Sequence, residues 1–191
     1  DLSEESLAHA NSVWGCQEGR RIISVGSLKS QKNHKMLLQA FHALGDDAAR
    51  LLILGQGPLE GELRKLATEL GRASQVVFAG FHSDPAPFYA TADLFVLSSD
   101  YEGFGNVIVE SLGQGTPVVS TDCPSGPSEI LAGGRYGALV PVGDANALAV
   151  AMRDALERTH DVSELKSRAD DFSAERAAKA YLDLLLPRRP K

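Results

Sequence analysis

The amino-acid sequence predicts an α/β fold, a Rossmann-like parallel sheet of six strands with helices on both faces. Short apolar runs alternate along the chain with longer amphipathic stretches. Glycine closes the first two apolar runs, at Gly26 and Gly55. Repeated strand–helix units favour a parallel sheet, because each helix crosses over one face of the sheet to reach the next strand.

Three strand–helix units are expected in the first half of the chain. Residues 21–25 form the first strand and residues 33–44 the first helix. Apolar residues recur in that helix at helical spacing: Met36, Leu37, Ala40, Phe41 and Leu44. The second strand covers residues 51–54 and precedes a helix over 58–70, with Pro58 near its first turn and Gly71 at its end. Residues 75–79 form the third strand, and a short helix over 87–90 follows.

Three further units are expected in the second half. Residues 94–97 form the fourth strand, which is followed by a helix over 106–112. The fifth strand covers 117–120 and leads to a short helix over 125–131, for which Ser125 or Ser128 is the candidate N-cap. Residues 138–140 form the sixth strand. The last helix of the sheet covers 144–158 and has an apolar face: Leu148, Ala151, Met152 and Ala155.

We divide the chain into a linker segment over residues 1–19, the Rossmann-like domain over 20–160 and a helical tail over 161–191. The polar start suggests a piece cut from a longer chain. The tail has apolar residues at helical spacing and then two prolines: Ala177, Ala180, Tyr181, Leu184, Leu185, Pro187 and Pro190. This apolar stripe is suited to pack either on the present domain or on a partner domain, and both alternatives stay open.

Composition argues against several classes of function. The chain has 25 acidic residues against 19 Lys and Arg, and its net charge of -6 argues against broad nucleic-acid binding. No apolar run approaches the roughly 20 residues that span a bilayer. The two cysteines, Cys16 and Cys123, lack the spacing of metal ligands, which indicates neither a zinc site nor a disulfide framework. A reducing, cytoplasmic setting fits this usage.

Two lysines follow the first strand, in a segment that begins with Gly26 and Ser27. The glycine lets a ligand approach the backbone, and the helix N-terminus that comes next favours phosphate. Lys29 and Lys32 are placed to neutralise a diphosphate. The alternative is a solvated loop with ordinary surface lysines.

A glycine-rich loop follows the fourth strand and carries Glu102, and Glu110 lies eight residues later within the expected helix. Gly103 and Gly105 let backbone amides face a ligand, and the start of the next helix offers an anion site. Carboxylates accept hydrogen bonds from sugar hydroxyls, so the pair is suited to grip two sugars. Glycosidase chemistry also uses paired carboxylates, and a helix cap plus a surface residue is the alternative without function.

Two other loops carry weaker signals. Residues 121–129 form a rigid loop with two prolines, in which Cys123 is more typical of a packed thiol than of a nucleophile. After the third strand, the segment with Phe81 and His82 is placed to present main-chain groups to a nucleobase. His82 and His34 are otherwise ordinary histidines.

Together these segments resemble the carboxy-terminal domain of retaining GT-B glycosyltransferases of family 4 (glycosyl transferases group 1). The likeness runs from Val25 to Leu28 and over residues 31–34, 54–59, 76–81 and 92–98. The stretch from Glu102 to Glu110 resembles the family's E-x7-E motif and is the most specific part. The resemblance spans about residues 20–160, including 116–119 and 137–143.

The resemblance implies that a nucleotide-sugar lies across the strand ends of this domain, one half of a GT-B architecture. Lys32 matches the lysine that binds the diphosphate, Glu110 the carboxylate that holds the ribose and Glu102 the one that contacts the donor sugar. Lys32 and Glu102 are then the candidate catalytic residues. The Phe81–His82 loop would face the base. Main-chain amides would meet the sugar or the diphosphate at Gly103, Phe104, Gly105, Asn106 and Val107.

The resemblance also implies transfer of a hexosyl group, with retention, to a glycan or lipid-linked acceptor in polysaccharide biosynthesis. Many members carry an arginine where Ser27 stands, so Lys29 is the candidate for the missing charge. No Asp-x-Asp motif stands at a strand end, so we expect no metal and no cofactor besides the donor, for which we choose a UDP-sugar. An amino-terminal domain would supply the acceptor site, and peripheral contact with the inner face of a membrane would come through it. We therefore expect this chain to bind donor but to transfer little alone.

Two other classes of function fit the same architecture. One is a sugar-nucleotide epimerase or a phosphorylase, although neither cleft catalytic groups nor a pyridoxal-phosphate lysine is evident in the sequence. The other is a nucleotide-binding module without catalysis. A receiver-like module would carry clustered acidic residues at the ends of its early strands, where Gly26 and Gly55 stand. The base, the sugar and the acceptor stay open.

Overall fold

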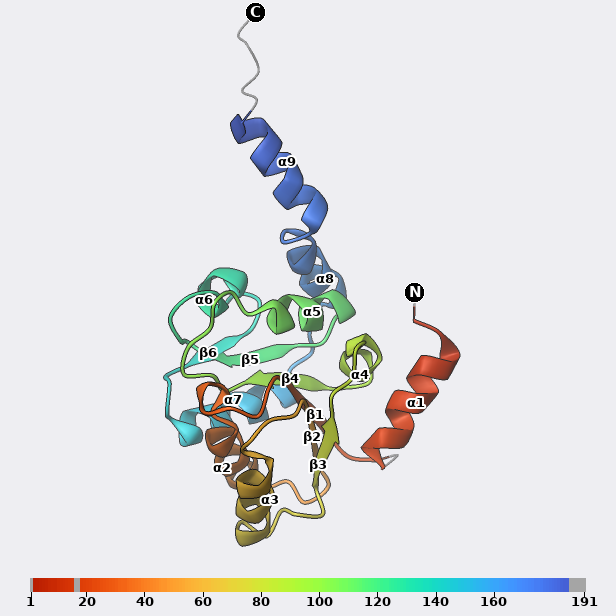
Figure 1. Ribbon diagram of the computed structural model, residues 1–191, viewed down its shortest axis with the longest axis vertical. Helices are drawn as coiled ribbons and strands as arrows, with labels where there is room; N and C mark the ends of the chain where they lie inside the picture. Colours follow the sequence, from red (N-terminus) through yellow and green to blue (C-terminus); the bar gives the residue numbers. More distant parts are fainter. Residues whose placement is uncertain (1, 16–17, 186–191) are drawn as a thin grey trace, which may run out of the picture.

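The computed structural model describes residues 2–15 and 18–185, and it confirms the expected α/β fold. Its sheet has six strands in the order β3-β2-β1-β4-β5-β6, and all neighbours are parallel. Each strand begins within one residue of its expected start. The strands are β1 (Arg21–Val25), β2 (Arg50–Leu54), β3 (Val76–Gly80), β4 (Leu94–Leu97), β5 (Val118–Thr121) and β6 (Ala138–Val140). Figure 1 shows the sheet between its layers of helices.

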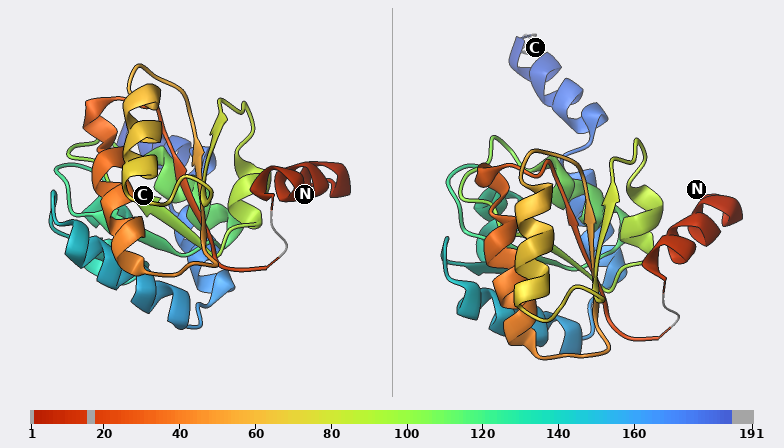
Figure 2. Two further views of the ribbon diagram at one scale, coloured as in Figure 1. Left: turned by 90° about the horizontal axis from the view of Figure 1, so that it is seen from below. Right: turned by 60° about the horizontal axis from the view of Figure 1, so that its bottom comes forward.

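One face of the sheet is covered by α2 (His34–Leu44), α3 (Glu60–Glu69) and α7 (Ala145–Glu157). Figure 2 shows α2 and α3, in orange and yellow, on the side of the sheet opposite to α4. Side chains that alternate along the strands, such as Ile22, Leu51 and Ile53, are fully buried against this layer. Their neighbours Ile23 and Leu52 are fully buried on the opposite face. Burial on both faces explains why the strands read as continuous apolar runs.

The opposite face is covered by shorter helices. They are α4 (Ala86–Ala90), α5 (Asn106–Gln114), α6 (Pro127–Ile130) and α8 (Val162–Asp170). Two 3-10 turns, η1 (Ser30–Lys32) and η2 (Ala132–Gly134), precede α2 and β6. The expectation that a serine caps α6 is wrong: the helix starts after Gly126, and no side chain that the structure describes caps it. Ser125 lies at φ 66 and Gly126 at φ 92, so the chain enters α6 through a backbone turn instead.

The segment expected as a linker contains a helix, α1 (Glu4–Trp14). The Ser3 hydroxyl accepts a hydrogen bond from the Ser6 amide at its start, and Gly15 ends it in a left-handed conformation. Trp14 is fully buried against the α4 side of the domain, and its indole N–H donates to Thr91 Oγ1 at 3.0 Å. Ala10 is also fully buried, so α1 packs on the domain through these two side chains although its sequence is mostly polar.

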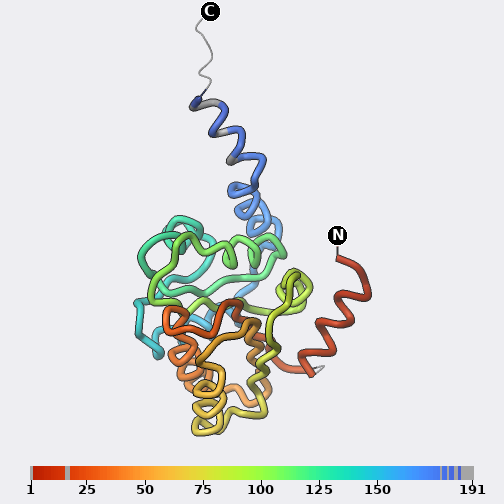
Figure 3. Tube along the Cα trace, in the orientation of Figure 1, coloured from red at the N-terminus to blue at the C-terminus, as the bar shows by residue number. Residues whose placement is uncertain are grey.

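The tail forms two helices, α8 and α9 (Ala174–Leu185). Leu165 and Ala169 of α8 are buried on the domain, whereas α9 points away from it, as Figure 3 shows in blue. Tyr181 and Leu185, part of the expected apolar stripe, are exposed. Cys16 and the two prolines at 187 and 190 lie outside the described residues. Within the described part of the chain, no helix is long and apolar enough to cross a membrane.

Candidate functional site

The carboxyl ends of β1 and β4 lie side by side where the strand order reverses. β1 pairs with β2 on one side and with β4 on the other, so the chain winds outward in both directions from this point. Ligands of open parallel sheets bind in the crevice outside such a reversal. Lys32 follows β1 and Glu102 follows β4, and the topology brings these residues together across 70 positions of sequence.

Lys32 and Glu102 form a shielded ion pair at this point. The distance from Lys32 Nζ to Glu102 Oε1 is 2.7 Å, and the two side chains are 16% and 7% exposed. The Ser99 hydroxyl donates to the same carboxylate oxygen at 2.5 Å. The lysine methylenes pass over Gly26, where a Cβ atom would come within 3.1 Å of Lys32 Cε. A glycine at this strand end therefore lets the lysine reach across to the glutamate.

Hydrogen bonds join the loops that follow β1 and β4. The Ser98 hydroxyl donates to the Lys32 carbonyl at 2.8 Å, and the Asn33 amide donates to Asp100 Oδ1 at 2.7 Å. Asn33 also caps α2, because its side-chain oxygen accepts from the Met36 N–H at 3.2 Å. This helix was expected to favour phosphate at its N-terminus, but its own cap already satisfies that amide.

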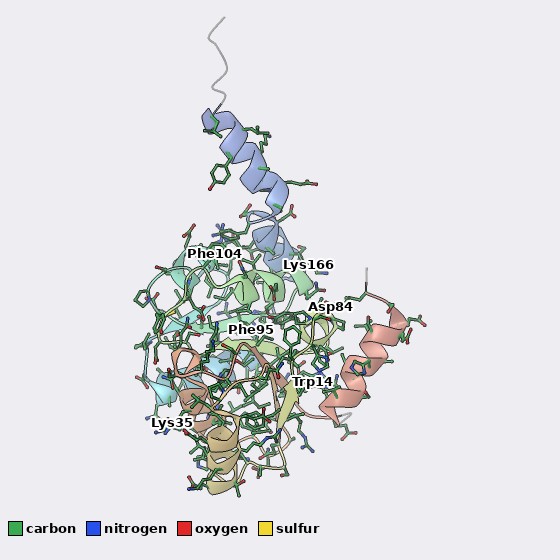
Figure 4. All side chains as sticks on the ribbon, viewed as in Figure 1. Trp14, Lys35, Asp84, Phe95, Phe104 and Lys166 are labelled. Atoms are coloured by element: carbon green, nitrogen blue, oxygen red, sulfur yellow. The ribbon has the colours of Figure 1, made fainter. Side chains whose placement is uncertain are left out.

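The glycine-rich loop ends in a helix start without a side-chain cap. Gly105 is the N-cap of α5 at φ 93, and no side chain within the described ranges caps this helix, whose first amides belong to Asn106 and Val107. Gly126 packs directly against this loop, because a Cβ atom at Gly126 would lie only 1.7 Å from the Phe104 carbonyl oxygen. Figure 4 shows Phe104 on the α5 side of the sheet. Free amides at this end of α5 can bind an anion.

Glu110 lies on α5, apart from the ion pair. Its side chain is exposed, and Oε2 accepts a hydrogen bond from the Tyr89 hydroxyl at 3.2 Å. Tyr89 is fully buried, and burial, followed by the nearby Glu110 charge and their hydrogen bond, raises the pKa of its hydroxyl. Among the described residues, no hydrogen bond or ion pair joins Glu110 to Lys32 or Glu102. The structure thus brings two of the three expected side chains into contact and leaves the third one facing solvent.

The loop after β3 presents a phenylalanine rather than a histidine. Phe81 is 69% exposed. The His82 ring packs on Phe88 with ring centroids 4.6 Å apart, and its Nε2 lies 3.2 Å from the Ala79 carbonyl oxygen. A second ring contact, at 5.9 Å, joins His82 to His9 of α1. These contacts favour the ordinary structural role for His82 and leave Phe81 as the ring available to a ligand.

Lys29 points to a different depression. It lines a cavity of about 380 Å³ between η1 and α3, together with Leu59 and His34, and neither Lys32 nor Glu102 lines this cavity. His34 is buried, and burial and then the Lys32 charge lower the pKa of its ring to about 4. Within residues 2–15 and 18–185, no hydrogen bond or ion pair joins the Lys29 side chain to Lys32 or Glu102, and a role for Lys29 in binding the diphosphate stays a prediction.

Two residues that contact the glutamates, Ser99 and Tyr89, were not predicted from the sequence. Ser99 could have been predicted as a site residue, because it is the second of two serines that directly follow an apolar strand. Tyr89 could not, because its partner Glu110 lies in another helix. Cys123 is buried as expected of a packed thiol, and burial raises the pKa of its sulfur.

Comparison with known proteins gives a consistent result. Residues 19–158 match the model of the family described as glycosyl transferases group 1. The chain is 38% identical over 169 residues to the lipopolysaccharide core biosynthesis glycosyltransferase LpsE of Rhizobium meliloti, covering 86% of this chain and 49% of LpsE. It is 36% identical to a 4-alpha-N-acetylgalactosaminyltransferase of Campylobacter jejuni that acts on a diphospho-undecaprenol substrate by its name, covering 86% and 46%. The chain spans about half the length of these relatives.

Solved structures of GT-B glycosyltransferases share the fold. Anabaena Alr3699/HepE in complex with UDP and glucose superposes with a TM-score of 0.86 at 24% identity, over 96% of this chain and 53% of that one. The apo form of the lipopolysaccharide outer core galactosyltransferase WaaB superposes with a TM-score of 0.81 at 22% identity, over 91% and 50%. At these identities the likeness is one of fold.

Proposed function

The chain belongs to the glycosyl transferases group 1 family, and from this premise we propose that it binds the nucleotide-sugar donor of a retaining glycosyltransferase. The observation that carries the proposal is the Lys32–Glu102 pair at the point where the strand order reverses. A cation and a carboxylate side by side in this crevice match the two chemical parts of a nucleotide-sugar, an anionic diphosphate and a hydroxylated ring.

In this proposal the diphosphate is held by Lys32 and by the free amides at the start of α5. Lys32 turns from Glu102 to the phosphate when the donor binds, and Glu102 then accepts a hydrogen bond from a hydroxyl of the donor sugar. Glu110 accepts from the ribose, and the exposed Phe81 lies nearest the base. The proposal for Glu110 is supported by its exposure on α5, the helix whose first amides we propose to hold the diphosphate.

The proposed chemistry follows from where charge develops. When the sugar–phosphate bond breaks, negative charge grows on the leaving diphosphate. In the proposed donor complex Lys32 and the α5 amides contact the diphosphate before the bond breaks, so they need little further reorganisation to stabilise that charge. We propose that these groups act without a metal, as expected from the resemblance.

We propose that the acceptor binds outside this chain. Relatives are about twice as long, and we propose that an additional domain binds a glycan or lipid-linked acceptor. Because a cleft between two domains excludes water and orients the acceptor, the chain alone should bind donor with little transfer.

Calorimetric titration of the chain with UDP, GDP, ADP and their glucose conjugates tests the proposal. One nucleotide should bind, and Lys32→Met should weaken it by at least about tenfold, the loss expected for one charged hydrogen bond. Lys35→Met is the matched control, since Lys35 is an exposed lysine three residues away. Absence of binding by all three nucleotides, or equal effects of the two substitutions, contradicts the proposal. Conversion of a glucose conjugate to its epimer would identify the epimerase alternative instead.

A further inference from the structure

A buried hydroxyl holds one carboxylate oxygen of each glutamate in the proposed donor site. Ser99 donates to Glu102 Oε1 at 2.5 Å, and Tyr89 donates to Glu110 Oε2 at 3.2 Å. Both donors are fully buried. We propose that Ser99 and Tyr89 are positioning residues, Ser99 orienting Glu102 toward the donor sugar and Tyr89 orienting Glu110 toward the nucleoside. This inference rests on the function proposed above.

Ser99 is itself anchored, which makes it a fixed point for Glu102. Its carbonyl accepts a hydrogen bond from the Thr121 hydroxyl at 2.6 Å, and Thr121 is fully buried at the end of β5. In the free protein, Lys32 and Ser99 share the same carboxylate oxygen. Once Lys32 moves to the diphosphate, Ser99 is the donor that remains. It holds Oε1 in place and leaves Oε2 to accept from a sugar hydroxyl.

Tyr89 is also held in place, by one hydrogen bond and one ring contact. Its carbonyl accepts from the Thr116 hydroxyl at 2.7 Å, and its ring packs edge-on against Phe95 with centroids 5.5 Å apart. The raised pKa of its hydroxyl keeps it protonated, and so a donor, throughout the physiological range. Glu110 is exposed and without this bond would lose more side-chain freedom when a ligand orders it.

A merely structural role makes a different prediction. Buried hydroxyls need partners in any protein, so removing either one could simply loosen the site. Loosening would weaken a nucleotide and its sugar conjugate alike, whichever hydroxyl is removed. Positioning instead confines the effect of Ser99 to the sugar conjugate and makes the effect of Tyr89 depend on Glu110, so Tyr89→Phe should lose most of its effect in a Glu110→Gln background.

The test measures Kd by calorimetry for UDP and UDP-glucose, or for the GDP or ADP pair if that base binds tighter. Ser99→Ala should weaken UDP-glucose by about tenfold and UDP by less than about twofold, because only the conjugate meets Glu102. Tyr89→Phe should weaken both ligands by one common factor, of about three to ten, because both contain the ribose. Two controls should change neither: Ser120→Ala, a buried serine of β5, and Tyr136→Phe, next to the start of β6.

A double-mutant cycle ties Ser99 to Glu102. In a Glu102→Gln background, Ser99→Ala should have a clearly smaller effect on UDP-glucose, because the two residues act as one unit. Thermal unfolding checks that each variant is folded. Ser99→Cys replaces Ser99→Ala if the latter fails to fold, and its weak S–H donor should give an intermediate loss.

The possible outcomes distinguish a failure of the positioning roles from a failure of the proposed donor binding. If the wild-type chain binds no nucleotide, the proposed function fails. If the wild type binds and Lys32→Met weakens it, but Ser99→Ala affects UDP and UDP-glucose equally, the positioning role of Ser99 is overturned. The role of Tyr89 is overturned if Tyr89→Phe has no effect, if its effect is confined to UDP-glucose, or if its effect is undiminished in a Glu110→Gln background.

Discussion

Substitutions in the Lys32–Glu102 pair should affect the free energy of unfolding and nucleotide binding separately. Lys32→Met leaves the Glu102 carboxylate, 7% exposed, without its cation. Removing one partner of a buried pair costs about 3–5 kcal/mol, because the remaining charge is uncompensated. Ser99 still donates to the carboxylate and Lys32 keeps 16% exposure, so we expect the lower end of that range, about 3 kcal/mol. Glu102→Gln should also destabilise, because it leaves the lysine unpaired.

The double substitution Lys32→Met with Glu102→Gln should restore most of the loss. Replacing both charges of a buried pair by neutral groups of similar size is often close to neutral, so the double variant should lie within about 1 kcal/mol of the wild type. It should nevertheless bind nucleotide as poorly as Lys32→Met, since the diphosphate still lacks its cation. A variant that is stable and yet does not bind would show that the pair serves ligand binding rather than folding.

Urea unfolding measures the stabilities, with an unchanged m-value as the check that the same surface unfolds. Calorimetry with the tightest nucleotide measures binding. The reasoning is refuted if Lys32→Met costs less than about 1 kcal/mol, since the pair would then behave as an exposed one. It is equally refuted if the double variant is no more stable than Lys32→Met.

Three further predictions concern other parts of the fold. The pKa of His34 is lowered by burial to about 4 in the folded chain, against 6.5 in the unfolded one, so stability should fall as pH drops below 6.5, by about 2–3 kcal/mol from this group at pH 4.5. Urea unfolding at neutral pH and at pH 4.5 should show a smaller loss of stability for His34→Leu than for the wild type. The same loss in both proteins would contradict this prediction. Gly126→Ala should cost more than about 1 kcal/mol and weaken nucleotide binding, because its Cβ would lie 1.7 Å from the Phe104 carbonyl; thermal melts and titration measure both. Trp14→Ala should remove hydrogen-exchange protection from α1 while the sheet amides stay protected, and loss of protection across the whole domain would show that α1 is integral to folding.

The sheet was predictable because its strands are continuous apolar runs, which the local sequence shows directly. Residues 94–97 are apolar without interruption and form β4 with the expected bounds. The helix α1 was not predictable on this basis. Its buried residues are Ala10 and Trp14, and the hydrogen-bond partner of Trp14, Thr91, lies far along the chain, where local periodicity cannot indicate it.

The sequence by itself determined the fold class, the family resemblance and the segments that carry Lys32, Glu102 and Glu110. These follow from strand-end glycines and from the spacing of the two glutamates, which are properties of short segments. Only the tertiary structure decided that Lys32 meets Glu102 and that Tyr89 holds Glu110. The physical reason is that a parallel sheet joins segments by strand order rather than by distance in sequence, and contacts across the reversal between β1 and β4 exist only once that order has formed.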